Sequence, residues 1–393
     1  MNSDPVVILA ARRTPVGAFQ GAFASVTAPQ LGSVAIKAAL SDSGVAASQV
    51  SEVIMGCVLS AGIGQAPARQ AALGAGLPSS VPTTTVNKMC GSAMRAVMLA
   101  CDQLLAGSAE IVVAGGLESM TNAPYLLPKA RAGYRMGNQE VLDHMFYDGL
   151  QSPWDGKLMG CFAEATAEKY QFTRKAQDDF AAESLRRSLA AIANGDFAAQ
   201  IATVTAKTRK GEVLVDKDET PFTLDIAKIP TLKPAFKKDG TVTAASSSGI
   251  SDGAAALVLA RESFAKSQGK KPLARIVGYS SFALEPEWFT IAPVGAMQKL
   301  LTQLNWQAKD VDLYEINEAF AAVPMAAIKD LGLDHQKVNV HGGACALGHP
   351  IGATGARILT TLLYALRGRG KKRGIASLCI GGGEATAVAI ELM

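Results

Sequence analysis

Apolar and polar positions follow one another along the chain in blocks that predict strands and helices in alternation. Continuous apolar runs of strand length occupy residues 5–10, 50–56, 83–87 and 110–116. Residues 91–107 instead repeat an apolar residue every three or four positions, which is typical of a helix with one buried face. Strands that are apolar throughout are buried on both faces, so this alternation predicts a layered α/β fold.

The second part of the chain repeats the pattern of the first. Residues 50–59, "VSEVIMGCVL", parallel residues 310–320, "DVDLYEINEAF". Residues 83–97, "TTTVNKMCGSAMRAV", parallel residues 337–355, "KVNVHGGACALGHPIGATG". Each member of the second pair is a strand ending in Val-Asn, a turn of small residues and the start of a helix. We therefore predict two similar α/β halves that pack together.

The segment between these repeats has a different character. Residues 120–249 contain proline-rich turns, a polar helical pattern at 173–197 and a charged stretch at 207–220. Such a composition is typical of a segment that faces solvent. The predicted organisation is an N-terminal half, an inserted loop domain and a C-terminal half, at residues 1–119 with 250–271, 120–249 and 272–393 respectively.

Composition and charge exclude several classes of protein. The chain has 393 residues and a formal net charge of +4, which is too close to balance to favour a nucleic-acid partner. The basic run at 367–373 is interpreted as a solvated turn that can attract an anionic ligand. No apolar stretch reaches the ~18 residues of a membrane span. The beginning of the chain lacks the pattern of an export signal, so we expect a cytoplasmic protein.

The six cysteines lack CxxC spacing, which argues against a zinc site and a disulfide framework. Cys90 instead lies between a predicted strand and a predicted helix. Free N–H groups at a helix N-terminus stabilise a thiolate, so we expect Cys90 to be a nucleophile. The alternative is a cysteine that serves as a small buried apolar residue.

His349 occupies the matching turn of the second half, within the glycine-rich segment 341–355. Glycine permits a close approach of backbone or ligand because it has no Cβ atom. The N-terminus of the following helix is expected to lower the pKa of His349 and keep the ring neutral. A neutral imidazole is what a general base requires.

Two further residues complete the predicted site. Cys379 ends a strand before three glycines, whose free N–H groups can form an oxyanion hole, and its thiol can move a proton. Asn317 also follows a strand, and its amide can hold a water molecule or an oxyanion. The alternative for Asn317 and Glu318 is helix capping.

Five segments resemble motifs of the thiolase family, in the family's order and over nearly the whole chain. They are "ARRTPVGAFQGAF", "VNKMCGSAMRAV", "NEAFA", "NVHGGACALGHPIGATGARI" and "CIGGG". The resemblance implies a five-layered αβαβα fold of two similar halves, with a loop domain inserted in the first half. This fold agrees with the repeat inferred from the pattern alone.

The resemblance also implies a role for each site residue. Cys90 would attack an acyl-CoA and carry the acyl group as a thioester, and His349 would activate Cys90. Cys379 would remove the α-proton of a second acetyl-CoA. The N–H groups of Cys90 and Gly381 would hold one oxyanion, and His349 with a water on Asn317 would hold the other. The family needs no metal or redox cofactor, and coenzyme A is a substrate or product.

Coenzyme A would lie against the inserted region in such an enzyme. The residues implied as its contacts are Ser248, Phe236, Leu150, Met159, Ala244, Ala319 and Phe320. Phe289 is a candidate for closing the acyl pocket to long chains, since a filled pocket excludes added methylene groups. We therefore expect an acetyl-CoA C-acetyltransferase that assembles as a homo-oligomer, a dimer or tetramer, with contacts at 83–87 and 124–137.

Two alternatives stay open, and the chain departs from the family in places. One alternative is a degradative 3-ketoacyl-CoA thiolase of broad chain length, and the other is a non-catalytic subunit that binds acyl-CoA. A ketoacyl synthase would lack the Cys379 segment, and a cysteine hydrolase would not need a second cysteine. The departures are Leu158 in "KLMG", the stretch "AASSSG", Phe222 in place of an arginine and "EATA" after the triple glycine.

Overall fold

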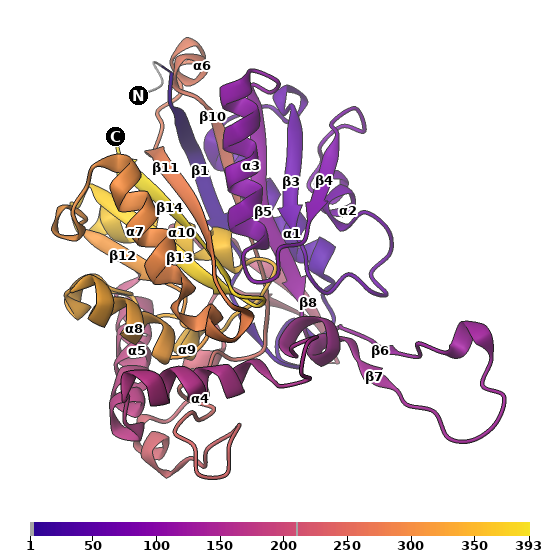
Figure 1. Cartoon of the computed structure of the whole chain (residues 1–393). Coiled ribbons are helices and arrows are strands. Elements are labelled where there is room, and N and C mark those ends of the chain that lie inside the picture. Colours follow the sequence, from indigo (N-terminus) through magenta and orange to yellow (C-terminus); the bar gives the residue numbers. More distant parts are fainter. Residues whose placement is uncertain (1–3, 210) are drawn as a thin grey trace.

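A large mixed sheet forms the centre of the protein (Figure 1). The computed structural model describes residues 4–209 and 211–393, so residues 1–3 of the predicted N-terminal half and Lys210 of the charged stretch lie outside it. The strand order is β12-β13-β14-β11-β1-β10-β5-β3-β4. The strands are β1 (Val6–Arg13), β3 (Glu52–Gly56), β4 (Thr83–Val86), β5 (Ile111–Ser119), β10 (Ser251–Arg261), β11 (Ala274–Ala283), β12 (Leu313–Ile316), β13 (Arg373–Ile380) and β14 (Glu384–Leu392).

The two parts of this sheet repeat one topology. In the first, β4, β3 and β5 run parallel, while β10 and β1 continue the sheet in antiparallel pairing. In the second, β12 pairs parallel with β13, and β14 and β11 follow antiparallel. A parallel bridge from Tyr314 to Val338 stands where β4 stands in the first part. Within the described residues, strands of the two parts pair with each other where Val7 and Ile8 of β1 meet β11.

Helices complete five layers around the sheet. The largest apolar core surrounds α3 and α10 and takes residues from strands of both parts, so these two helices form the middle layer. A second core packs α1 and α2 on the outer face of the first part, and a third packs α7 and α8 on the outer face of the second. The helices are α1 (Ala28–Ser43), α2 (Pro67–Gly74), α3 (Ser92–Ala106), α7 (Ala292–Leu304), α8 (Ala322–Leu331) and α10 (Thr354–Gly368). The predicted fold of two similar halves is confirmed.

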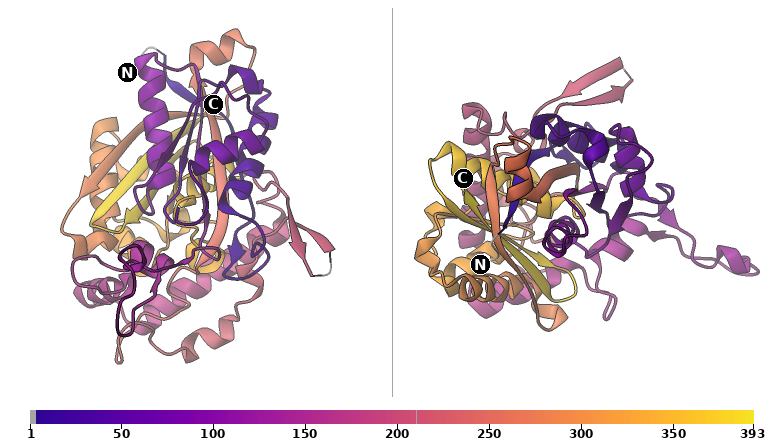
Figure 2. Two further views of the ribbon diagram at one scale, coloured as in Figure 1. Left: turned by 90° about the vertical axis from the view of Figure 1, so that its right-hand side faces the viewer. Right: turned by 90° about the horizontal axis from the view of Figure 1, so that it is seen from above.

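The chain leaves the large sheet after β5 and returns at β10. Among the described residues 120–250, none forms a strand of that sheet. The segment holds α4 (Met159–Tyr170) and α5 (Arg174–Asn194), which lie together at one end of the molecule (Figure 1). Its two hairpins, β6–β7 (Tyr125–Leu126, Leu142–Asp143) and β8–β9 (Val204–Thr208, Gly211–Val215), project from the body (Figure 2). No helix of the described chain has the length and apolar content that a membrane crossing requires.

Candidate active site

Cys90 lies in a strained turn between β4 and α3. Met89, the residue before it, has a left-handed backbone with φ of 46°, which costs a non-glycine residue ~1–2 kcal/mol. The Ser92 hydroxyl secures the turn, because it accepts a bond from the Lys88 N–H (2.8 Å) and donates one to the Met89 carbonyl (2.6 Å). Backbone strain of this kind is concentrated at functional sites.

The Cys90 thiol is protonated at rest. Burial raises the pKa of Cys90 to about 11, while hydrogen bonds from the backbone N–H groups of Gly381 and of Cys90 itself lower it by less. Loss of solvation therefore outweighs the stabilisation that the N–H groups give a thiolate. The thiol needs a base at the moment it attacks. The same two N–H groups are the pair predicted to form an oxyanion hole.

Cys379 lies beside Cys90. It is completely buried at the end of β13, and burial followed by the neighbouring Cys90 raises the pKa of its thiol well above the ordinary value. A Cβ atom on Gly91 would lie 2.4 Å from the Ile380 side chain, so the Cys90 turn packs directly on the strand that carries Cys379. The structure thus brings together the two cysteines that were predicted from different halves.

The His349 ring is held in one tautomer. Its Nδ1 lies 2.6 Å from the Thr354 hydroxyl oxygen, and that hydroxyl donates its only proton to the Pro350 carbonyl at 2.9 Å. The hydroxyl oxygen therefore accepts from His349, so Nδ1 carries the ring proton. Nε2 therefore carries the ring's lone pair, as a general base requires.

The His349 ring is also neutral. Burial, and to a smaller extent the nearby Arg357 guanidinium, lowers the pKa of His349 to about 3. The predicted direction is confirmed, but its cause is burial rather than the helix end. The helix α10 begins only at Thr354, beyond the His349–Pro350 turn.

Asn317 faces His349 from the end of β12. Its Nδ2 lies 3.5 Å from His349 Nε2, and its Oδ1 is buried without a hydrogen-bond partner among the described residues. An unsatisfied buried oxygen is costly and is usually paired with water or a ligand. The pair can therefore receive one further polar group, as the prediction for Asn317 requires.

Glu318 fastens the segment that precedes His349. Its carboxylate accepts hydrogen bonds from the Ser184 hydroxyl (2.7 Å), the Asn339 amide (2.8 Å) and the Cys345 N–H (3.1 Å). The capping alternative is wrong for both Asn317 and Glu318, because α8 begins at Ala322 without a side-chain cap. Glu318 instead ties α5 of the inserted region to the second half.

The glycines around His349 allow other parts of the protein to approach. A Cβ atom on Gly348 would lie 2.1 Å from the Ser251 hydroxyl oxygen, and one on Gly355 would lie 2.4 Å from the Met94 backbone nitrogen. Protein atoms confine the remaining glycines of the segment as closely, at Gly342, Gly343 and Gly352. The expected close approach of backbone is confirmed, and an approach of substrate to these glycines stays a prediction.

Glu118 joins the two halves behind the site. Its carboxylate is buried and accepts hydrogen bonds from the N–H groups of Val58 (3.0 Å), Leu59 (3.1 Å) and Gly352 (2.9 Å). Burial raises the pKa of Glu118 to about 7. Sequence reasoning missed Glu118 and Thr354, because neither stands in a pattern that reveals its distant partners.

Most residues predicted to contact coenzyme A lie together. The Ser248 N–H donates to the Ala319 carbonyl at 2.9 Å. The rings of Phe236 and Phe320 meet edge to face with centroids 6.0 Å apart. The Met159 sulfur lies 3.6 Å from the point where Gly381 would carry a Cβ atom, so this group borders the oxyanion turn.

The other predicted contacts lie around this group. Leu150 packs on an apolar cluster that includes Ile351 and also touches Cys90. Ala244 is exposed on the Ser248 loop. Phe289 is only 3% exposed and packs edge to face on Phe162. Its core cluster includes Cys379, and a role in closing the acyl pocket stays a prediction.

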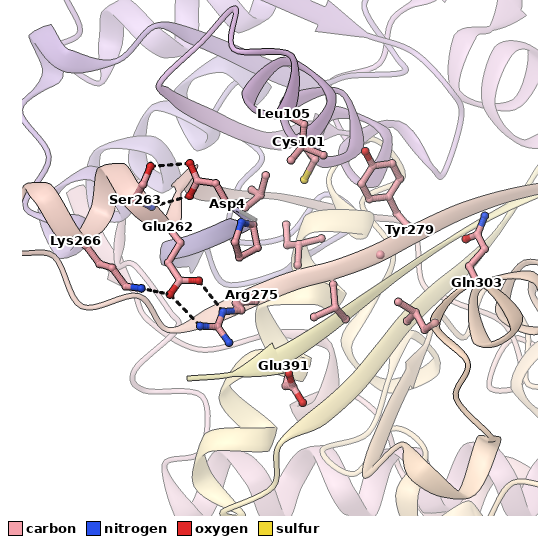
Figure 3. A pocket seen from close by; sticks show the side chains of 16 residues that line it. Asp4, Cys101, Leu105, Glu262, Ser263, Lys266, Arg275, Tyr279, Gln303 and Glu391 are labelled. Carbon is pink, nitrogen blue, oxygen red and sulfur yellow. Dashed lines mark hydrogen bonds and ion pairs between the residues drawn. The ribbon is translucent and has the colours of Figure 1, made fainter. Parts of the chain in front are cut away.

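A cavity of about 850 Å³ lies away from these residues (Figure 3). None of the predicted site residues lines it. Its charged groups are already engaged, since Glu262 pairs with Arg275 and Lys266, and Asp4 accepts from the Ser263 hydroxyl. The charged side chains of the cavity are therefore already paired with other residues of the protein. The neighbouring thiols of Cys90 and Cys379 make their surroundings the better candidate for the active site.

Comparisons with known proteins agree with this site. The family model "Thiolase, N-terminal domain" matches residues 6–263, and "Thiolase, C-terminal domain" matches residues 270–392. The acetyl-CoA acetyltransferase of Cupriavidus necator is 50% identical over 390 residues, which cover 98% of this chain and 99% of that protein. The acetyl-CoA acetyltransferase of Schizosaccharomyces pombe is 47% identical over 393 residues, which cover both chains completely.

Solved structures are similar over the same extent. The Bacillus anthracis acetyl-CoA acetyltransferase superposes with a TM-score of 0.97 at 44% identity and covers 99% of each chain. An Ascaris suum thiolase in complex with coenzyme A gives a TM-score of 0.94 at 41% identity, covering 99% of this chain and 100% of that one. The fold and the site define an acyltransferase that uses cysteine. The chain belongs to the thiolase family.

Proposed function

We propose that the protein is an acetyl-CoA C-acetyltransferase, which reversibly joins two acetyl-CoA into acetoacetyl-CoA and free coenzyme A. The observation that carries the proposal is the Cys90 sulfur, which faces the N–H groups of Cys90 and Gly381 with Cys379 beside it. Proteins named acetyl-CoA acetyltransferase match the chain over nearly its full length.

Acyl transfer to Cys90 is the first step of the proposed reaction. The thiol attacks the thioester carbon of acetyl-CoA while its proton passes to Nε2 of His349, the ring nitrogen that holds a free lone pair. The negative charge that develops on the thioester oxygen is stabilised by the N–H groups of Cys90 and Gly381. The Cys379 thiol gives its proton to the departing coenzyme A and becomes a thiolate, His349 keeps the Cys90 proton on Nε2, and an acetyl group remains on the Cys90 sulfur.

Carbon–carbon bond formation is the second step. The Cys379 thiolate removes the α-proton of the second acetyl-CoA, and the enolate oxygen accepts hydrogen bonds from the His349 Nε2–H and from a water on Asn317. The enolate carbon attacks the acetyl group on Cys90, the bond to sulfur breaks, and acetoacetyl-CoA forms while the Cys90 sulfur takes back its proton from His349. Full burial of Cys379 and Asn317 suits this step, because an enolate is stabilised best by fixed dipoles in a dry site.

Coenzyme A would lie along the inserted region at residues 120–249. The cluster of Phe236, Phe320, Met159 and Ser248 supports this placement, because it forms an apolar surface with a polar edge beside Gly381. We also propose that the three predicted units, residues 1–119 with 250–271, 120–249 and 272–393, are the functional domains. The inserted unit would bind the substrate tail, and the other two would supply the reacting groups.

A substrate series tests the function. The wild-type protein is expected to cleave acetoacetyl-CoA with free coenzyme A and to gain one acetyl group on the Cys90 peptide, measured by mass spectrometry. The Cys90→Ala variant should lose both, whereas Cys57→Ala, which alters a buried cysteine outside the reaction, should keep the acetyl group on Cys90. Comparable rates on long 3-ketoacyl-CoA substrates would favour a degradative thiolase of broad chain length. Binding of acyl-CoA without acylation would indicate a non-catalytic subunit.

We further propose a homo-oligomer. β4 ends the sheet order, and its residues Thr83–Val86 are partly or fully exposed, so its outer edge is free to pair with the same strand of a second copy. The projecting hairpin β6–β7 can contact further copies. Light scattering during size-exclusion chromatography should give a mass of two or four chains. The expected location is the cytoplasm.

A further inference from the structure

Lys88 and Glu384 form an ion pair between the two turns that surround the Cys90 sulfur. Lys88 belongs to the Cys90 turn, and Glu384 is the first residue of β14, directly after the glycine turn 381–383. The two side chains are partly exposed, at 26% and 38%. The proposed mechanism gives neither residue a role.

Both ends of this ion pair are attached to firmly held backbone. The Lys88 N–H donates to the Ser92 hydroxyl at 2.8 Å, and the Lys88 carbonyl accepts from the Gly91 N–H at 3.0 Å. Glu384 pairs in the sheet with Ile380 on one side and Ala283 on the other. A contact between the two side chains therefore restrains the distance between the two turns.

The distance between these turns determines the geometry of the oxyanion hole. One N–H group of the hole comes from Cys90 in the first half, and the other comes from Gly381 in the second. The glycine turn has positive φ at Gly382 (102°) and Gly383 (90°), so the backbone beside Gly381 is of the kind that glycine alone adopts readily. A small shift of this turn would move the Gly381 N–H away from the developing charge.

We propose that the Lys88–Glu384 ion pair positions the oxyanion hole by holding the Gly381 turn against the Cys90 turn. Both are positioning residues, since they act through Cys90 and Gly381. The inference rests on the proposed function. A partly exposed ion pair adds little to the stability of the fold, whereas a misplaced oxyanion donor costs a large factor in rate. Its effect should therefore appear in kcat rather than in Tm.

The test compares Lys88→Ala, Glu384→Gln and the charge exchange Lys88→Glu with Glu384→Lys in thiolysis of acetoacetyl-CoA. Each single variant should lose about tenfold in kcat with little change in KM, because ground-state binding is kept. The charge exchange should recover most of that loss. Lys175→Ala is the matched control, since Lys175 pairs with Asp179 on the exposed face of α5 and should keep full activity.

A second measurement does not depend on the substrate. The N–H groups that face Cys90 also stabilise its thiolate, so the single variants should react more slowly with iodoacetamide at Cys90, and the charge exchange should restore the rate. Unchanged kcat and unchanged alkylation in both single variants would overturn the proposal. A rise in KM alone for Lys88→Ala would also overturn it, because Lys88 would then be a substrate contact. A wild-type protein that fails to cleave acetoacetyl-CoA would contradict the proposed function, while the alkylation rates would still decide the role of the ion pair.

Discussion

At the scale of single residues, the reactivity of the site depends on proton positions that neighbouring side chains impose. Thr354 gives its hydroxyl proton to the Pro350 carbonyl and so can only accept from His349. Cys90 keeps its own proton because its surroundings penalise a thiolate. The resting site therefore contains a neutral thiol and a neutral base, and charge appears only as the reaction proceeds.

Removal of the Thr354 hydroxyl should disturb this arrangement. In Thr354→Val, Nδ1 of His349 loses its acceptor and the lone pair is no longer fixed on Nε2, so kcat for thiolysis should fall by ~10- to 100-fold. Thr354→Ser keeps the hydroxyl and should stay within about threefold of the wild type, as rescue by a conservative variant. Equal kcat in the valine and serine variants would contradict the assigned tautomer.

At the scale of elements, the site depends on how closely the two central helices approach. α3 begins just after Cys90, and α10 begins just after the His349 turn, so the turns that lead into these two helices carry the reacting groups. A Cβ atom on Gly355 of α10 would lie 2.4 Å from the Met94 backbone nitrogen of α3. Backbone atoms cannot move aside as a flexible side chain can, so this contact sets the spacing of the helices.

Gly355→Ala should therefore weaken both fold and catalysis. The added methyl group forces α10 away from α3, so the free energy of unfolding should fall by about 1–3 kcal/mol, as for other overpacked cores. The measurement is the urea midpoint together with kcat. Gly368→Ala is the control, because a Cβ atom at this end of the same helix meets nothing within 4 Å. A Gly355→Ala protein as stable as this control would show that the helices adjust without cost.

The helical and strand patterns were visible in the sequence because they depend on local periodicity. The predicted segments 83–87 and 91–107 correspond to β4 and α3 within one or two residues. Cys90, His349, Cys379 and Asn317 were found from motifs, and the structure places Cys90 beside Cys379 and His349 beside Asn317. The hydrogen bond from Gly352 to Glu118 and the ion pair between Lys88 and Glu384 join segments that are distant in the sequence. No local sequence pattern predicts them. The raised pKa of Cys90 could not be predicted from the sequence, because burial is a property of the whole fold.

At the scale of the whole molecule, buried carboxyl groups link stability to pH. Burial raises the pKa of Glu118 to about 7 and that of Glu315 to about 8, from an ordinary value of 4.5. Between 4.5 and these values the folded protein keeps protons that the unfolded chain has released. The contribution of these two carboxyl groups to stability is therefore expected to fall as the pH rises through this window, and the loss from each group is complete above its folded pKa.

This link can be measured directly. Glu118 should lower the free energy of unfolding in urea by about 2–3 kcal/mol between about pH 5 and pH 8. His349 acts in the opposite direction, because its lowered pKa removes a penalty as the pH rises, so the test is the difference between variants. Glu118→Gln does not titrate and should show a flatter profile, whatever its stability at any single pH. Glu110→Gln at the exposed start of the same strand region is the control and should follow the wild-type slope. Parallel profiles for Glu118→Gln and the wild type would exclude Glu118 as a source of the dependence.

The crowded glycines around His349 have a consequence for how such proteins are recognised. Each is confined by atoms from a distant part of the chain, including Ser188, Glu318, Ser251 and Met94. In the segment 341–355, which helps to identify the family, the glycines are therefore required mainly for packing. Only His349 takes part in the proposed chemistry. A descendant could exchange His349, lose catalysis and still keep every glycine that the scaffold needs. Assignment to the family and assignment of activity are separate inferences, and the second requires each reacting residue to be inspected.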